Sequence, residues 1–197
     1  TRAAERVSND AEVHYALGCA HVALGEARKA RADWERAVHD RATRPAALLQ
    51  IARLLAREAD LTGSLARVQE ALREDPRMLR AGSFEVILLR RLGQTKEAQQ
   101  RLAEWQAEDP TNSTLRNEAT RLGADDLGLW SHLAGDPQRV LEVALNYMEL
   151  AAWDDALALL AREYPEGPAV HPEPGMPLPQ RHPEVLYYRG YCREKLG

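Results

Sequence analysis

The chain has 197 residues and a formal net charge of −4 at pH 7. Hydrophobic residues make up 45% of it, which is enough to bury a core and too many for a disordered chain. No apolar run approaches the roughly 18 residues of a membrane-spanning helix. Cys19 and Cys192, the two cysteines, are too few for a disulfide framework. Abundant Ala and Leu with few β-branched residues favour helices.

Three consecutive segments of 34 residues, 11–44, 45–78 and 79–112, align without gaps. Two of their columns hold small residues almost throughout. The eighth column reads Gly18, Ala52 and Val86, and the twentieth reads Ala30, Ser64 and Ala98. Because two antiparallel helices approach closely only where side chains are small, each segment predicts a helix–turn–helix unit with a close crossing.

The predicted helix ends carry their own signals. Leu24-Gly25 and Leu92-Gly93 fall in the same two columns, and glycine supplies the left-handed conformation that ends a first helix. Asp75-Pro76 and Asp109-Pro110 predict the end of each second helix, since proline cannot continue it. Each segment therefore contains one complete helix pair.

The period is less regular after residue 112. A fourth unit is predicted at about 137–164, and 183–197 matches a first helix alone. Residues 113–136 are too short for a full repeat, so we expect a degenerate one, with short helices at about 113–122 and 125–133 turning at Gly123. Six of the eleven prolines lie in 165–182, which is either a solvated connector or a docking segment. Helix starts are predicted at Asn9, with Glu12 three residues later, and at Asp136-Pro137.

This 34-residue unit, with its Leu-Gly pair, small residues and closing proline, resembles the tetratricopeptide repeat. The resemblance implies an all-α fold without a sheet. It would be a right-handed α-solenoid of antiparallel helix pairs running as a single array over 1–197. It also implies a non-catalytic scaffold that binds a protein or peptide on its concave face.

The 137–197 stretch is also similar to long bacterial tetratricopeptide-repeat proteins. Those carry an upstream β-sandwich domain of unknown function and are suspected of links to carbohydrate. The alternative is therefore an accessory module that positions or oligomerises a larger, carbohydrate-related bacterial protein.

His14, Cys19 and His21 lie close together in the first predicted helix. The two histidines share one helix face while Cys19 lies roughly 140° away, so the three cannot bind one metal from a single helix. They are a structural histidine pair, or a metal pair completed from elsewhere. The adjacent acids Asp125-Asp126 and Asp154-Asp155 are typical of helix N-termini. With no catalytic motif in the sequence, we predict no enzyme activity, no metal and no cofactor.

The family resemblance implies that the concave face is lined by columns two, five, nine, twelve and thirteen. The candidate partner-binding residues in these columns are Tyr15, Cys19, Arg53, Arg57, Arg80, Arg90, Arg91, Leu145, Met148, Tyr187 and Tyr191. In the second and third repeats these columns hold all five arginines and no acid, which favours an acidic segment of a partner or a solvated helix face. The four apolar residues form a second groove or the core of further repeats.

The chain begins with Thr1, so we expect it to be a piece of a longer protein, with a cytoplasmic location. The predicted partner is a protein or peptide. Neither nucleic acid nor a membrane is expected, because the net charge is acidic and no span is present. Self-association of the fragment is predicted, because its last helix exposes an apolar face.

Overall fold

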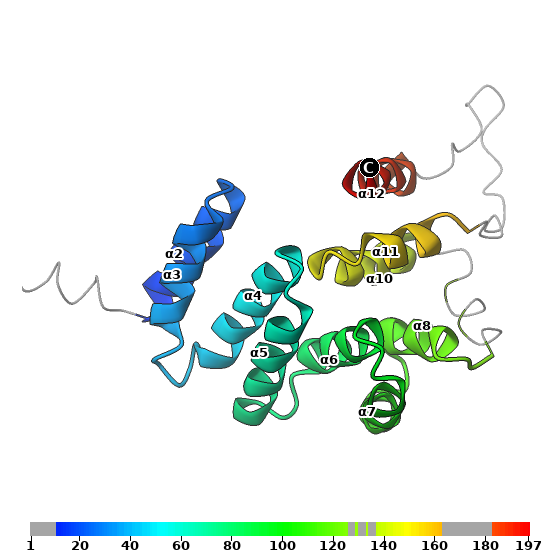
Figure 1. Ribbon diagram of the computed structural model, residues 1–197, viewed down its shortest axis with the longest axis horizontal. Helices are drawn as coiled ribbons and strands as arrows, with labels where there is room; N and C mark the ends of the chain where they lie inside the picture. Colours follow the sequence, from blue (N-terminus) through cyan, green and yellow to red (C-terminus); the bar gives the residue numbers. More distant parts are fainter. Residues whose placement is uncertain (1–10, 126–128, 130–132, 134–136, 163–182) are drawn as a thin grey trace, which may run out of the picture. The chain divides into compact units, whose positions relative to one another are not determined.

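The structure, a computed structural model, describes residues 11–125, 129, 133, 137–162 and 183–197. Within these ranges every regular element is an α-helix and there is no strand, which confirms the all-α prediction (Figure 1). The helices are α2 (Ala11–Ala23), α3 (Ala27–Ala37), α4 (Arg44–Arg57), α5 (Leu61–Glu74), α6 (Leu79–Arg91), α7 (Thr95–Glu108), α8 (Ser113–Arg121), α10 (Pro137–Glu149), α11 (Trp153–Leu160) and α12 (Pro183–Leu196). None of them is both long and apolar enough to cross a membrane.

Several predicted features lie outside the described residues. They are the caps at Asn9 and Asp136, most of the second short helix at 125–133, and the proline-rich stretch at 165–182. Both Asp-Pro signals are confirmed, because α5 ends at Glu74 and α7 ends at Glu108, directly before them.

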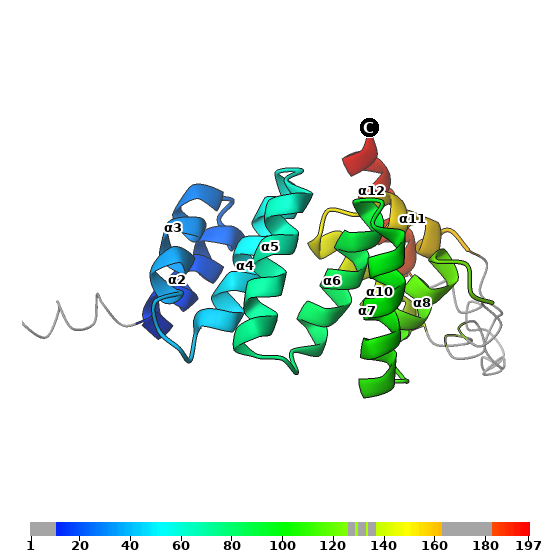
Figure 2. The ribbon, with the colours of Figure 1, turned by 60° about the horizontal axis from the view of Figure 1, so that its bottom comes forward.

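The helices divide into two compact units, Thr1–Arg101 and Leu102–Gly197. In the first unit, α2 packs on α3, α3 on α4, α4 on α5, and α5 on α6. Figure 2 shows the α2–α3 and α4–α5 pairs side by side in this unit. In the second unit, α10 packs on α8 and α11, and α12 packs on α11. The single array over 1–197 stays a prediction.

The first helix of each pair ends in a residue with left-handed backbone. Gly25 (φ 75°) follows α2 and Gly93 (φ 76°) follows α6, as predicted, but alanines adopt this conformation after α4 (Ala59, φ 63°) and α10 (Ala151, φ 53°). The backbone N–H of Gly25 donates to the Val22 carbonyl at 3.0 Å, and the next N–H donates to the His21 carbonyl at 2.8 Å. This pair of hydrogen bonds satisfies carbonyls that the helix leaves open, and it reverses the chain within three residues.

The close crossings lie where the small residues predicted them. Gly18 is buried against Trp34, and a Cβ atom built on Gly18 would overlap the indole ring. Ala30, Ser64 and Ala98 of the other small column are fully buried. The eighth-column residue of the first repeat is therefore glycine because the indole occupies the space of a side chain.

The degenerate segment is held by buried polar contacts. Tyr147 of α10 donates from its hydroxyl to Glu118 of α8 at 2.7 Å and accepts from Asn117 Nδ2 at 2.6 Å. Burial, with the Glu118 carboxylate second, raises the pKa of Tyr147 well above its usual range. Arg121 of α8 forms an ion pair with Asp155 of α11 at 2.8 Å. Asp155 is thus a helix N-terminal acid, as predicted, and also the buried partner of an arginine.

We predict that Ala59→Gly stabilises the chain by about 0.5–1 kcal/mol, because glycine adopts a left-handed backbone without the strain that alanine has there. Denaturation by urea measures the change. Ala66→Gly, at an exposed position inside α5, is the matched control and is expected to destabilise by about 1 kcal/mol. Equal effects of the two substitutions would contradict the left-handed assignment.

We predict that Gly18→Ala destabilises the chain by about 1–3 kcal/mol, because its methyl group would displace the Trp34 indole from a packed core. Gly190→Ala in α12 is the control, since a Cβ atom there meets nothing within 4 Å and should be neutral or stabilising. Melting temperatures of the two variants test this difference in sign. A Gly18→Ala variant as stable as Gly190→Ala would show that the crossing is looser than described.

Candidate functional site

A hollow of about 190 Å³ lies in the first unit, between α2 and α3 on one side and α4 on the other. Its walls bring together three of the predicted partner-binding residues, Cys19, Arg53 and Arg57. The described residues that line it are Cys19, Val22, Trp34, Gln50, Arg53, Leu54 and Arg57. The hollow therefore combines apolar, polar and cationic side chains from three helices.

The floor of the hollow is part of the hydrophobic core. Trp34 is 2% exposed and Leu54 is 6% exposed, and both belong to the cluster that joins α3 to α4. Val22 of α2 packs against the same cluster. Because these side chains are held by the core, the floor is preformed and offers an apolar surface to a ligand.

The rim is basic. Arg53 is half-buried and Arg57 is exposed, and they lie one turn apart on α4, where side chains share a face. Among the described residues, no acidic one lines the hollow. Two cations at this spacing repel one another, so a bound anion would relieve that repulsion. Arg57 also lies in the last turn of α4, where a cation interacts favourably with the helix dipole.

Gln50 connects the basic rim to Tyr15. Arg53 Nη1 donates to Gln50 Oε1 at 2.8 Å, and Gln50 Nε2 donates to the Tyr15 hydroxyl at 3.2 Å. The sequence pointed to Tyr15 and Arg53 but missed Gln50, since it lies in the sixth column, outside the columns of the concave face. Its position three residues before Arg53 on a helix was the available signal, because side chains at that spacing are neighbours.

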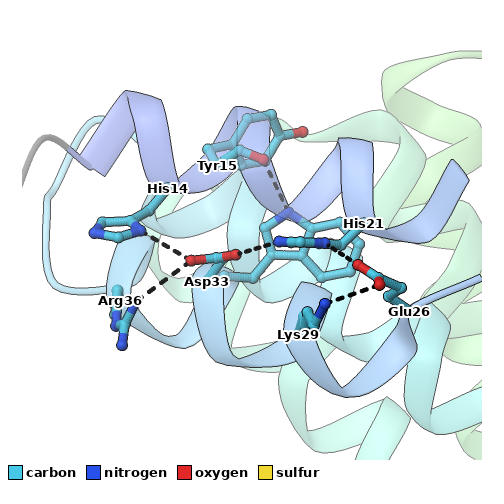
Figure 3. A network of polar contacts seen from close by, with 8 residues as sticks. His14, Tyr15, His21, Glu26, Lys29, Asp33 and Arg36 are labelled. Carbon is cyan, nitrogen blue, oxygen red and sulfur yellow. Dashed lines mark hydrogen bonds and ion pairs between the residues drawn. The ribbon is translucent and has the colours of Figure 1, made fainter. Parts of the chain in front are cut away.

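The two histidines of α2 converge on one buried acid, Asp33 of α3 (Figure 3). His14 Nδ1 donates to Asp33 Oδ1 at 3.0 Å, and His21 Nε2 lies 3.4 Å from Asp33 Oδ2. Arg36 approaches the same carboxylate at 3.5 Å. The histidines share one helix face, as predicted. Asp33 was not predicted, although it lies on the buried stripe of α3.

Glu26 extends this network at the turn between α2 and α3 (Figure 3). It accepts from Lys29 at 2.8 Å and from His21 Nδ1 at 2.6 Å. These two hydrogen bonds, that from Lys29 first, hold the pKa of Glu26 below its usual range. The contacts fasten α2 to α3 and so hold Cys19 and Val22, which lie on α2, at the wall of the hollow.

In the ranges that the structure describes, no three His, Cys, Asp or Glu side chains are placed to hold a metal ion. Cys19 belongs to the hollow and not to the histidine network, which agrees with the predicted angular separation.

The predicted arginines of α6 do not line the hollow. Arg80 is exposed, and its guanidinium carbon lies 5.9 Å from the centre of the Phe84 ring. Arg90 and Arg91 are half-buried in the last turn of α6. Of the five predicted arginines, Arg53 and Arg57 are therefore the two that line the hollow, and a shared basic face with α6 stays a prediction.

The predicted apolar groove of the second unit is partly core. Met148 is only 7% exposed, whereas Leu145 is 37% and Tyr187 is 66% exposed. Tyr191 packs edge-on against Trp153 of α11, with ring centres 5.7 Å apart. Only Leu145 and Tyr187 thus present a large surface to solvent.

The sequence matches no model of a known protein family and no curated protein. Several solved structures are similar. YrrB, whose structure is described as a TPR protein with an unusual peptide-binding site, superposes over 81% of this chain and 87% of its own, with a TM-score of 0.55 and 16% identity.

Two further structures come from named bacteria. TTC0263, a thermophilic TPR protein of Thermus thermophilus, matches 95% of this chain and 99% of its own, with a TM-score of 0.54 and 21% identity. MamA of Desulfovibrio magneticus matches 76% of this chain and 71% of its own, with a TM-score of 0.50 and 14% identity. At sequence identities this low, the similarity to these structures shows the fold alone. The chain therefore has the tetratricopeptide-repeat fold, built from antiparallel helix pairs.

Proposed function

We propose that the chain is a non-catalytic scaffold that binds an acidic segment of a partner protein, with the hollow between α2 and α4 as the anchoring point. The observation that carries this proposal is the combination of a basic rim and an apolar floor, with no acid among the described lining residues. Such a surface complements a peptide that carries a carboxylate beside an apolar side chain.

The size of the hollow favours a peptide side chain over a cofactor or substrate. Its volume is about 190 Å³, whereas sites for small molecules typically occupy about 300–1,000 Å³. A single apolar side chain resting on Trp34 and Leu54 would fill much of the space. The rest of the peptide would then run outside the hollow, past Arg53 and Arg57.

The charge of the rim favours a carboxylate. Guanidinium groups present parallel N–H donors that match the two oxygens of a carboxylate. Arg53 and Arg57 come from one helix face, so one ligand group reaches both of them. A lysine pair would provide charge without this geometric match.

The fold supports this proposal by analogy. YrrB is described as having a peptide-binding site, and it shares the helix-pair architecture of this chain. Helix pairs of this kind leave first-helix side chains facing one another across neighbouring repeats, as Cys19 and Arg53 do here.

We predict that Arg53→Glu with Arg57→Glu abolishes binding of a fluorescein-labelled peptide of alternating glutamate and leucine. The expected loss of affinity is about tenfold or more, since charge-assisted hydrogen bonds are replaced by repulsion. Fluorescence anisotropy measures the affinity. Arg28→Glu with Arg41→Glu changes the net charge equally at two exposed positions outside the hollow and should leave binding intact.

Unchanged affinity of the Arg53/Arg57 variant would overturn the proposal. So would failure of the wild-type protein to bind the peptide. If the mass measured by light scattering then rose with protein concentration, the predicted self-association and the alternative, an oligomerisation module of a larger protein, would be favoured. The exposed Leu186, Tyr187 and Leu196 of α12 are the surface for that alternative.

A further inference from the structure

We propose that Tyr15 and Gln50 are specificity-determining residues that position Arg53 for the carboxylate of the ligand. The inference rests on the proposed function, because it concerns the ligand chemistry of the same hollow. It is carried by a chain of hydrogen bonds from Arg53 to Gln50, at 2.8 Å, and from Gln50 to Tyr15, at 3.2 Å.

The donor and acceptor of each of these two hydrogen bonds follow from the chemistry of the side chains. A guanidinium only donates, so the amide oxygen of Gln50 must face Arg53. The amide nitrogen of Gln50 is then directed at Tyr15, whose oxygen accepts the hydrogen bond. Tyr15 is not among the described residues that line the hollow, so it acts on the ligand only through Gln50 and Arg53.

Tyr15 is itself fixed in position. Its backbone carbonyl accepts from Trp34 Nε1 at 3.2 Å, a contact drawn in Figure 3, and its ring packs against the core cluster of α3 and α4. The same indole forms part of the floor of the hollow. The hydrogen-bond chain is therefore anchored to the core at its Tyr15 end.

Holding Arg53 in place matters because free arginine side chains lose much conformational freedom when they bind. Ordering a long side chain at an interface opposes binding. Gln50 orders Arg53 before the ligand arrives, whereas no hydrogen bond or ion pair supports the exposed Arg57 among the described residues. We thus assign geometric recognition of the carboxylate to Arg53 and general electrostatic attraction to Arg57.

The test compares Tyr15→Phe and Gln50→Leu with the wild-type protein. The probes are the peptide of alternating glutamate and leucine and its counterpart with glutamine in place of glutamate. We expect each variant to bind the glutamate peptide about three- to tenfold more weakly, the range for loss of one hydrogen bond. Binding of the glutamine peptide should change less, so the ratio of the two affinities falls.

Controls separate positioning from folding. Tyr188→Phe in α12 and Gln69→Leu in α5 are the same substitutions outside the hollow, and they should leave the affinity ratio unchanged. The melting temperatures of Tyr15→Phe and Gln50→Leu report any loss of structure.

The outcomes distinguish the two proposals. If the wild-type protein does not bind the glutamate peptide, the proposed function fails. If it binds and the ratio is unchanged in both variants, the positioning role is overturned while the proposed function stands. An equal loss for both peptides would also overturn it, because that is the effect of general damage to the hollow.

Discussion

The architecture depends on the tight reversal that joins the two helices of each pair. A residue in left-handed conformation after the first helix lets two backbone N–H groups cap the open carbonyls, and the second helix starts within a few residues. So short a connection forces the two helices to lie antiparallel and close. Only small side chains then fit where the two helices cross. At Gly18 the Trp34 indole occupies the space that a side chain would need, so the residue there is glycine.

Trp34 links this constraint to the candidate site. Its indole ring lies against Gly18, its nitrogen donates to the carbonyl of Tyr15, and the side chain forms part of the floor of the hollow. A close helix crossing in the first pair thus also shapes the surface that the first pair presents to α4. Binding and stability are therefore coupled at this residue.

Three buried acidic side chains each pair with a basic side chain of another helix. Asp33 meets two histidines, Glu85 meets Arg101 at 2.8 Å, and Asp155 meets Arg121 at 2.8 Å. Each acid lies on the buried stripe of its helix and reaches a partner on a different helix. Removing one partner would leave a buried charge uncompensated, which is strongly destabilising. We infer that these pairs hold their helices in register.

The sequence by itself determined the helix pairs, because a period of 34, small residues at two columns and glycine or Asp-Pro at the ends all report local backbone and packing requirements. Helical periodicity placed Arg53 and Arg57 on one face of their helix, and the family resemblance implied that Cys19 shares the concave face with them. Only the tertiary structure decided that Asp33 lies between two histidines, that Gln50 holds Arg53, and that Met148 is buried. These contacts join side chains of separate helices. They depend on the distance between the helices and on their relative rotation, and the spacing of residues along the sequence does not specify either.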